Sequence, residues 1–142
     1  MNERAGRRVG LALAVTIMLV AIGAPPAAAS VADKFQMPVI PPDAEGYSIL
    51  GWGHLQHEGG GVYHPGEDWN GNDGGDTDKG DPVYSTANGE VTAADDYGSG
   101  WGNIVLVKHE LTTGEEVWSQ YAHLEEISVS EGESVVIGQK VG

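Results

Sequence analysis

The sequence predicts a nearly all-β domain with antiparallel strands, and three observations lead to this prediction. Short runs rich in β-branched residues recur after Pro82, and glycine-containing turns separate them. No segment after residue 30 has the apolar period of an amphipathic helix. The connections between the runs are too short for the crossovers that parallel strands need, so an antiparallel sheet core or sandwich is expected.

The N-terminus, residues 1–29, has the composition of a secretory signal peptide. A basic region, an apolar run and a small-residue cleavage site follow one another at Arg4 to Arg8, Val9 to Ala24 and Ala27 to Ala29. The apolar run is shorter than the roughly 20 residues of a spanning helix. We therefore expect an exported protein (secreted, periplasmic or wall-associated) with no stable membrane span after cleavage; a retained anchor is the alternative.

Two segments with little apolar periodicity come next. Residues 30–50 contain Pro38, Pro41 and Pro42 and are expected to form an extended linker. From Gly51 to Asp81 the chain is rich in Gly, His, Asp and Asn, which predicts a loop region, the usual place for a site. Its acidic part, 70–81, lacks the order of an EF-hand calcium loop, so a flexible acidic rim is favoured.

The strands are expected after this loop. Asn88-Gly89 predicts a hairpin between two short strands, and Gly98 to Asn103 predicts a glycine-rich turn. Strict alternation in the 115–124 run would place Tyr121 and His123 on one face of the sheet. The expected strands are 82–86, 90–94, 104–109 and 115–124, and a last pair at 127–129 and 135–141.

Charge and cysteine content exclude several classes of function. The chain has 7 basic and 21 acidic residues, a net charge of −14. Cleavage after Ala29 would leave 113 residues, in which four lysines face 20 acids and the net charge is −16. Such a surface repels nucleic acid. The absence of cysteine excludes disulfides, thiolate zinc sites and a lipid-modified cysteine in this sequence.

His64 and Asp68 are the first candidates for a site, because both side-chain types bind zinc. Gly66 lets the backbone bend between them, and Pro65 limits the freedom lost when the two side chains converge. A catalytic zinc usually has three protein ligands and a water, so these two leave the set incomplete. On spacing alone, a solvated loop is the alternative. His54 and His57 are expected at the surface or around the site rather than as ligands.

A series of further motifs makes the solvated loop the less favoured of the two alternatives. They are His64-Pro65-Gly66-Glu67-Asp68-Trp69-Asn70, Gly80-Asp81-Pro82-Val83-Tyr84, Ala87-Asn88-Gly89-Glu90-Val91, Gly102-Asn103-Ile104-Val105, Tyr121-Ala122-His123-Leu124 and Gly138-Gln139-Lys140-Val141-Gly142. Over about residues 60–142 this series resembles the lysostaphin/LytM-type zinc metallopeptidases. Any one motif is weak, whereas the ordered set is specific.

The resemblance implies a Zn²⁺-dependent β-sheet core at 51–142 that cleaves peptide cross-links of bacterial peptidoglycan. By position, His64 and Asp68 match the first two zinc ligands. His123 matches the catalytic histidine of the Tyr-x-His-Leu segment, which helps handle the proton of the attacking water. The family's final His-x-His pair, with the third ligand, would follow Gly142. The domain is therefore expected to lack its last strand, as a fragment or as a degenerate homologue.

Two other functions stay open from the sequence. A homologue without activity would keep the groove and bind or regulate the cell-wall machinery. A lipoyl-like carrier or binding module shares the Gly-Glu-Val hairpin pattern, but the β region has no lysine at a hairpin tip to carry an acyl group. Among the tryptophans, Trp101 is the best candidate for substrate contact. His109, at the end of an apolar strand, is expected to bond a backbone group.

Overall fold

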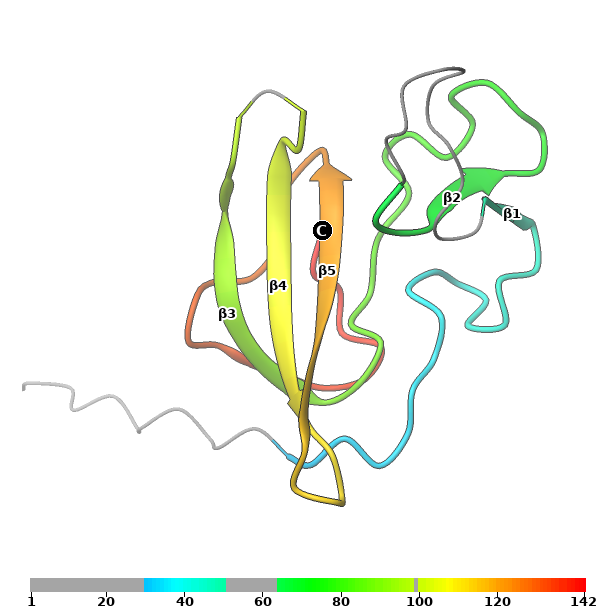
Figure 1. Ribbon diagram of the computed structural model, residues 1–142. Coiled ribbons are helices and arrows are strands. Elements are labelled where there is room, and N and C mark those ends of the chain that lie inside the picture. Colours follow the sequence, from blue (N-terminus) through cyan, green and yellow to red (C-terminus); the bar gives the residue numbers. More distant parts are fainter. Residues whose placement is uncertain (1–29, 51–63, 99) are drawn as a thin grey trace, which may run out of the picture.

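The computed structural model describes residues 30–50, 64–98 and 100–142, which form two antiparallel sheets (Figure 1). β1 (Tyr47–Leu50) pairs with β2 (Asp68–Gly71), and a four-stranded sheet has the order β5-β4-β3-β6. The described residues contain no helix, so the all-β, antiparallel prediction is confirmed. The residues in these ranges form no helix that is long and apolar enough to cross a membrane.

The three long strands of the larger sheet follow one another along the chain. β3 (Gly89–Asp96) pairs with β4 (Asn103–Glu110), which pairs with β5 (Glu116–Leu124), while β6 (Ser134–Val135) pairs with the start of β3. The runs expected at 104–109 and 115–124 agree with β4 and β5 to within one residue at each end. Tight turns between these strands make the antiparallel arrangement unavoidable.

The core lies against one face of this sheet. β4 alternates between the core and the other face, so that Val105 and Val107 are fully buried. The C-terminal segment closes the core from the other side through Val129 and Val141. The complete cluster of buried residues is Val91, Val105, Val107, Tyr121, Leu124, Val129, Val135 and Val141.

The hairpin expected at Asn88-Gly89 is wrong. The 82–86 segment pairs with the C-terminal residues instead: Val83 N–H donates to the Gly142 carbonyl, and Val141 N–H donates to the Val83 carbonyl. Gly89 serves a close approach rather than a turn, because a Cβ there would overlap the Lys108 carbonyl oxygen. The Asn-Gly pair therefore marks tight packing between strands.

The β1–β2 pair lies in segments expected to be a linker and a loop. β1 ends residues 30–50, and β2 begins at Asp68, so the loop expectation is wrong at 68–71. The register joins Leu50 to Asp68 and Tyr47 to Gly71 across a long connection, which period-two patterns in four-residue strands cannot reveal. The expected signal peptide at 1–29, His54 and His57 lie outside the described residues.

Candidate metal site

The two residues expected to bind metal lie together. His64 precedes β2, and Asp68 is its first residue; Nε2 of the imidazole is 3.3 Å from Oδ1 of the carboxylate. With zinc–ligand bonds of about 2.0–2.1 Å at a tetrahedral angle, two ligand atoms lie about 3.3–3.4 Å apart. The observed separation and the donor types therefore fit two ligands of one zinc ion.

A third ligand is not present in the described part of the chain. In residues 30–50, 64–98 and 100–142, no group of three or more His, Cys, Asp or Glu side chains is arranged to hold a metal ion. The acidic loop at 70–81 lies within these ranges, and its side chains form no such group. The local donor set thus stops at His64 and Asp68.

His123 shares a small pocket with these two residues. The pocket has a volume of about 190 Å³ and is lined by His64, Pro65, Gly66, Glu67, Asp68, Trp101, Gln120 and His123. β2 and its preceding turn supply one wall, and the end of β5 supplies the other. The three side chains that the sequence singled out as a site are therefore brought to one place from two different sheets.

The alternation expected along β5 is wrong at its end. The register moves from Val105 opposite Tyr121 to Asn103 opposite Leu124, so β5 has one extra residue in a bulge. Tyr121 and Leu124 both enter the core, whereas His123 is exposed. The bulge thus turns the His123 side chain away from the core face that Tyr121 occupies and toward the pocket.

This placement puts the backbone of His123 in a strained conformation. Its φ of 58° lies in the left-handed region. A non-glycine residue there costs about 1–3 kcal/mol and persists only where the surroundings enforce it. Histidine is among the side chains enriched in this region.

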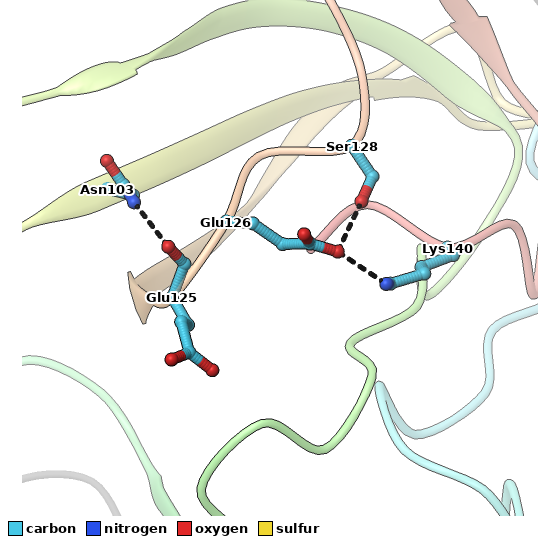
Figure 2. A network of polar contacts seen from close by, with 5 residues as sticks. All are labelled: Asn103, Glu125, Glu126, Ser128 and Lys140. Carbon is cyan, nitrogen blue, oxygen red and sulfur yellow. Dashed lines mark hydrogen bonds and ion pairs between the residues drawn. The ribbon is translucent and has the colours of Figure 1, made fainter.

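Asn103 at the start of β4 is a contributor that sequence reasoning did not single out. Its side-chain Nδ2 donates to the carbonyls of Leu124 (3.0 Å) and Glu125 (3.2 Å), which directly follow the bulge. Figure 2 shows the bond to Glu125, beside a second cluster in which Lys140 bridges to Glu126 at 2.7 Å. That ion pair lowers the pKa of the Glu126 carboxyl. The Gly102-Asn103 pair, at the point where β4 begins, was the available signal.

A larger cavity of about 820 Å³ adjoins the candidate site and lies between the β1–β2 pair and the end of β5. Asp68 and His123 line both hollows. In the lining of this cavity, Tyr47 donates a hydrogen bond of 2.6 Å to Asp81. This bond, followed by burial and the nearby acidic charges, raises the pKa of Tyr47 to about 12. The cavity gives an extended ligand room to approach the pocket.

His109 lies outside this site, as expected. It is fully buried, its Nδ1 lies 2.8 Å from the Asn88 carbonyl, and its Nε2 lies 2.7 Å from Ser119 Oγ. Because a carbonyl only accepts, Nδ1 must carry a proton. The expectation that His109 bonds a backbone group is confirmed.

Comparison with known proteins finds two relatives that match part of the chain. Lipoprotein NlpD of Yersinia enterocolitica is 36% identical over 63 residues, 44% of this chain and 61% of that protein. The uncharacterized lipoprotein YgeR of Escherichia coli (strain K12) is 34% identical over 63 residues, which cover 44% of this chain and 24% of that protein. The chain thus matches less than two thirds of the length of either relative. No solved structure matches significantly.

A family model gives the wider match. The model of peptidase family M23 matches residues 63–142, more than half of the sequence and the whole region from the His64 turn to the last residue. This range includes His64, Asp68 and His123, and it ends with the segment that closes the core. The resemblance to LytM-type peptidases is therefore confirmed at the level of the family, and the chain belongs to peptidase family M23.

Proposed function

We propose that this protein is a zinc-dependent metalloendopeptidase that cleaves peptide cross-links of bacterial peptidoglycan. The observation that carries the proposal is the meeting of His64, Asp68 and His123 at one pocket, in a chain that belongs to peptidase family M23. The separation of 3.3 Å between His64 Nε2 and Asp68 Oδ1 supports a shared metal ion.

Each residue then has a distinct task. His64 and Asp68 would hold the metal. Bound Zn²⁺ would supply acidification of a coordinated water and polarisation of the scissile carbonyl. His123 would take up the proton of the water as it attacks, and would deliver a proton to the departing amine. The mechanism needs no covalent intermediate, so no serine is assigned as a nucleophile.

The remaining ligand would come from a His-x-His segment that continues beyond residue 142. The second candidate function follows from the same point: because the described residues hold no group of three metal-binding side chains, a homologue without activity that binds or regulates wall machinery is the competing proposal. The two differ in whether an extended form of the chain takes up zinc and hydrolyses wall peptides.

The proposal also includes export of the protein and the kind of partner that it binds. The two relatives are named lipoproteins, and a protein that acts on the cell wall has to leave the cytoplasm. We propose export through the segment at 1–29, without lipid attachment within this sequence, because it has no cysteine. The strongly acidic composition argues against nucleic acid as a partner.

The decisive experiment compares metal content and hydrolysis on the same preparations. It uses a form extended by a His-x-His segment, either encoded downstream or appended from a family member, with purified peptidoglycan as substrate and release of new amino termini as readout. His64→Ala and Asp68→Ala should lose zinc and activity together. His123→Ala should keep zinc but lose turnover by about 10²–10⁴-fold.

Asp76→Ala is the matched control, because Asp76 is an exposed acid of the neighbouring loop that lines neither hollow. It should keep both zinc and activity. If the extended wild type binds zinc and releases no amino termini, the enzymatic proposal fails and the competing proposal of a homologue without activity stands. If His123→Ala stays fully active, the role of His123 as the proton carrier fails.

A further inference from the structure

Trp101 makes two separate contacts with His123. Its indole stacks on the imidazole, with ring centroids 6.3 Å apart and an interplanar angle of 12°. Its backbone carbonyl accepts the His123 N–H at 3.1 Å. One residue therefore fixes both the main chain and the ring of the histidine that faces the pocket.

Burial does not explain this placement of Trp101. Its side chain is 42% exposed and does not belong to the core cluster. Core packing therefore contributes little to the position of this side chain. The contact with His123 explains this position instead.

Backbone hydrogen bonds join the residues on either side of Trp101. Tyr97 N–H donates to the Gly102 carbonyl at 2.9 Å, and Gly102 N–H donates to the Gly98 carbonyl at 2.9 Å. Gly98 and Gly102 have φ of 74° and 62°, a conformation that side chains rarely allow. Such a turn offers Trp101 a defined position at the entrance to β4.

His123 needs an external support of this kind. Although histidine is among the residues enriched in the left-handed region, its backbone keeps this conformation only where the surroundings enforce it. Its ring stands at the exposed end of a bulge, where several side-chain rotamers would otherwise be open. A group that transfers protons has to sit within hydrogen-bond reach of the reacting atoms.

We propose that Trp101 is a positioning residue, which holds the His123 imidazole in the orientation required for proton transfer. The role of His123 as the proton carrier rests on the proposed function, whereas its placement by Trp101 does not. The alternative role of Trp101, a platform on which substrate stacks, uses the same indole. The two roles differ in the kinetic constant that they affect, since loss of a substrate platform raises KM and loss of positioning lowers kcat.

The first test is structural and uses the 142-residue chain itself. Histidine-labelled protein is examined by NMR, with His123 signals assigned through His123→Gln. In the wild type, the ring current of the indole should displace the ring-proton resonances of His123. Trp101→Ala should abolish that displacement, and Trp101→Phe should restore part of it. Trp118→Ala is the matched control, because Trp118 is 53% exposed on β5 and lines neither hollow.

The second test is kinetic and uses the extended, zinc-loaded form. Trp101→Ala should lower kcat about 10- to 100-fold with KM within about twofold and zinc content unchanged, since the loss concerns orientation rather than binding. Trp101→Phe should recover most of kcat. A raised KM with unchanged kcat, or His123 resonances unmoved in Trp101→Ala, would overturn the proposal. An inactive wild type with the expected NMR changes would refute the peptidase function and leave the placement of His123 supported.

Discussion

His123 shows how a single residue can depart from the pattern of its strand for a chemical reason. Alternation alone would direct it to the same face as Tyr121, and the extra residue of the bulge directs it to the pocket instead. The left-handed φ of 58° is the local cost, and contacts with Trp101 and Asn103 around the bulge offset it. Strained residues of this kind cluster at functional sites.

The pairing of His64 with Asp68 leads to a prediction about metal affinity. The 142-residue chain should bind zinc more weakly than a complete structural or catalytic site, because two or more coordination positions are left to water. Isothermal calorimetry with Zn²⁺ should show low affinity that His64→Ala abolishes. Nanomolar, one-to-one binding would contradict this and would direct attention to His54 or His57 as a third ligand.

Tyr47 leads to a prediction about pH. A tyrosine of the unfolded chain titrates near pH 10, whereas the bond to Asp81 raises the pKa of Tyr47 to about 12 in the folded protein. Between these values the unfolded chain has lost the proton that the folded chain still holds. The contribution of Tyr47 to the free energy of unfolding should therefore be fully present below pH 10. It should be lost as the pH rises toward 12, which lowers the free energy of unfolding by on the order of 1 kcal/mol after solvent screening.

The measurement is urea unfolding at several pH values between 9 and about 12. Tyr47→Phe has no proton to lose and should decline less steeply than the wild type. Tyr97→Phe, at a residue that is 57% exposed, should follow the wild type. Identical pH profiles for Tyr47→Phe and the wild type would show that the Tyr47–Asp81 bond does not form in solution.

At the scale of elements, a polar chain joins β4 and β5 to the 82–88 segment. Ser119 Oγ lies 2.7 Å from His109 Nε2 and 2.8 Å from the Tyr121 hydroxyl oxygen. The Tyr121 hydroxyl accepts the Thr86 N–H at 2.8 Å. Because Thr86 and Tyr121 are distant in sequence, this chain fixes how the 82–88 segment crosses the sheet. Buried polar groups that are fully bonded favour one arrangement over others.

Tyr121→Phe should therefore destabilise the domain although it keeps the aromatic ring in the core. The Thr86 N–H would lose its acceptor, at a cost of about 1–3 kcal/mol. Thermal unfolding followed by circular dichroism should show a Tm lower by about 4–8 °C for each kcal/mol lost. Tyr97→Phe serves again as the exposed control. An unchanged Tm for Tyr121→Phe would mean that solvent replaces the hydroxyl.

Some elements of this fold are predictable from their local sequence and others are not, for physical reasons. β4 and β5 are long, adjacent in sequence and bounded by turn residues, so the sequence predicts both strands, although not the bulge at the end of β5. β1 and β2 are four residues each and pair across a long connection, so no local pattern marked them. Asn88-Gly89 suggested a hairpin because the sequence does not reveal that Gly89 faces the Lys108 carbonyl.

The site shows the same division. His64 and Asp68 were recognisable because four residues and a glycine suffice to bring them together. Their meeting with His123 depends on two sheets and followed only from the family resemblance. The contact between Trp101 and His123 was not foreseen, because it depends on a bulge that moves the register of β5 by one residue.

At the scale of the whole molecule, the excess of negative charge is the feature that bears most on stability. Acidic residues outnumber basic ones by 21 to 7, and several acids lie in the 70–81 loop beside the larger cavity. Mutual repulsion of like charges destabilises a compact state, and salt screens this repulsion. General screening by ions has to be separated from specific binding of a cation in this loop.

We expect millimolar Ca²⁺ to leave the stability nearly unchanged once ionic strength is matched with NaCl. The reason is that the described residues hold no group of three acidic or histidine side chains arranged for a metal, whereas protein sites for Ca²⁺ are built largely around carboxylate oxygens. Thermal unfolding in CaCl₂ and in NaCl of equal ionic strength gives the comparison. Asp73→Asn, in the same loop, should behave as the wild type in both salts. A rise in Tm of several degrees that is specific to Ca²⁺ would show that the native state binds the ion, since only a ligand of the folded form stabilises it.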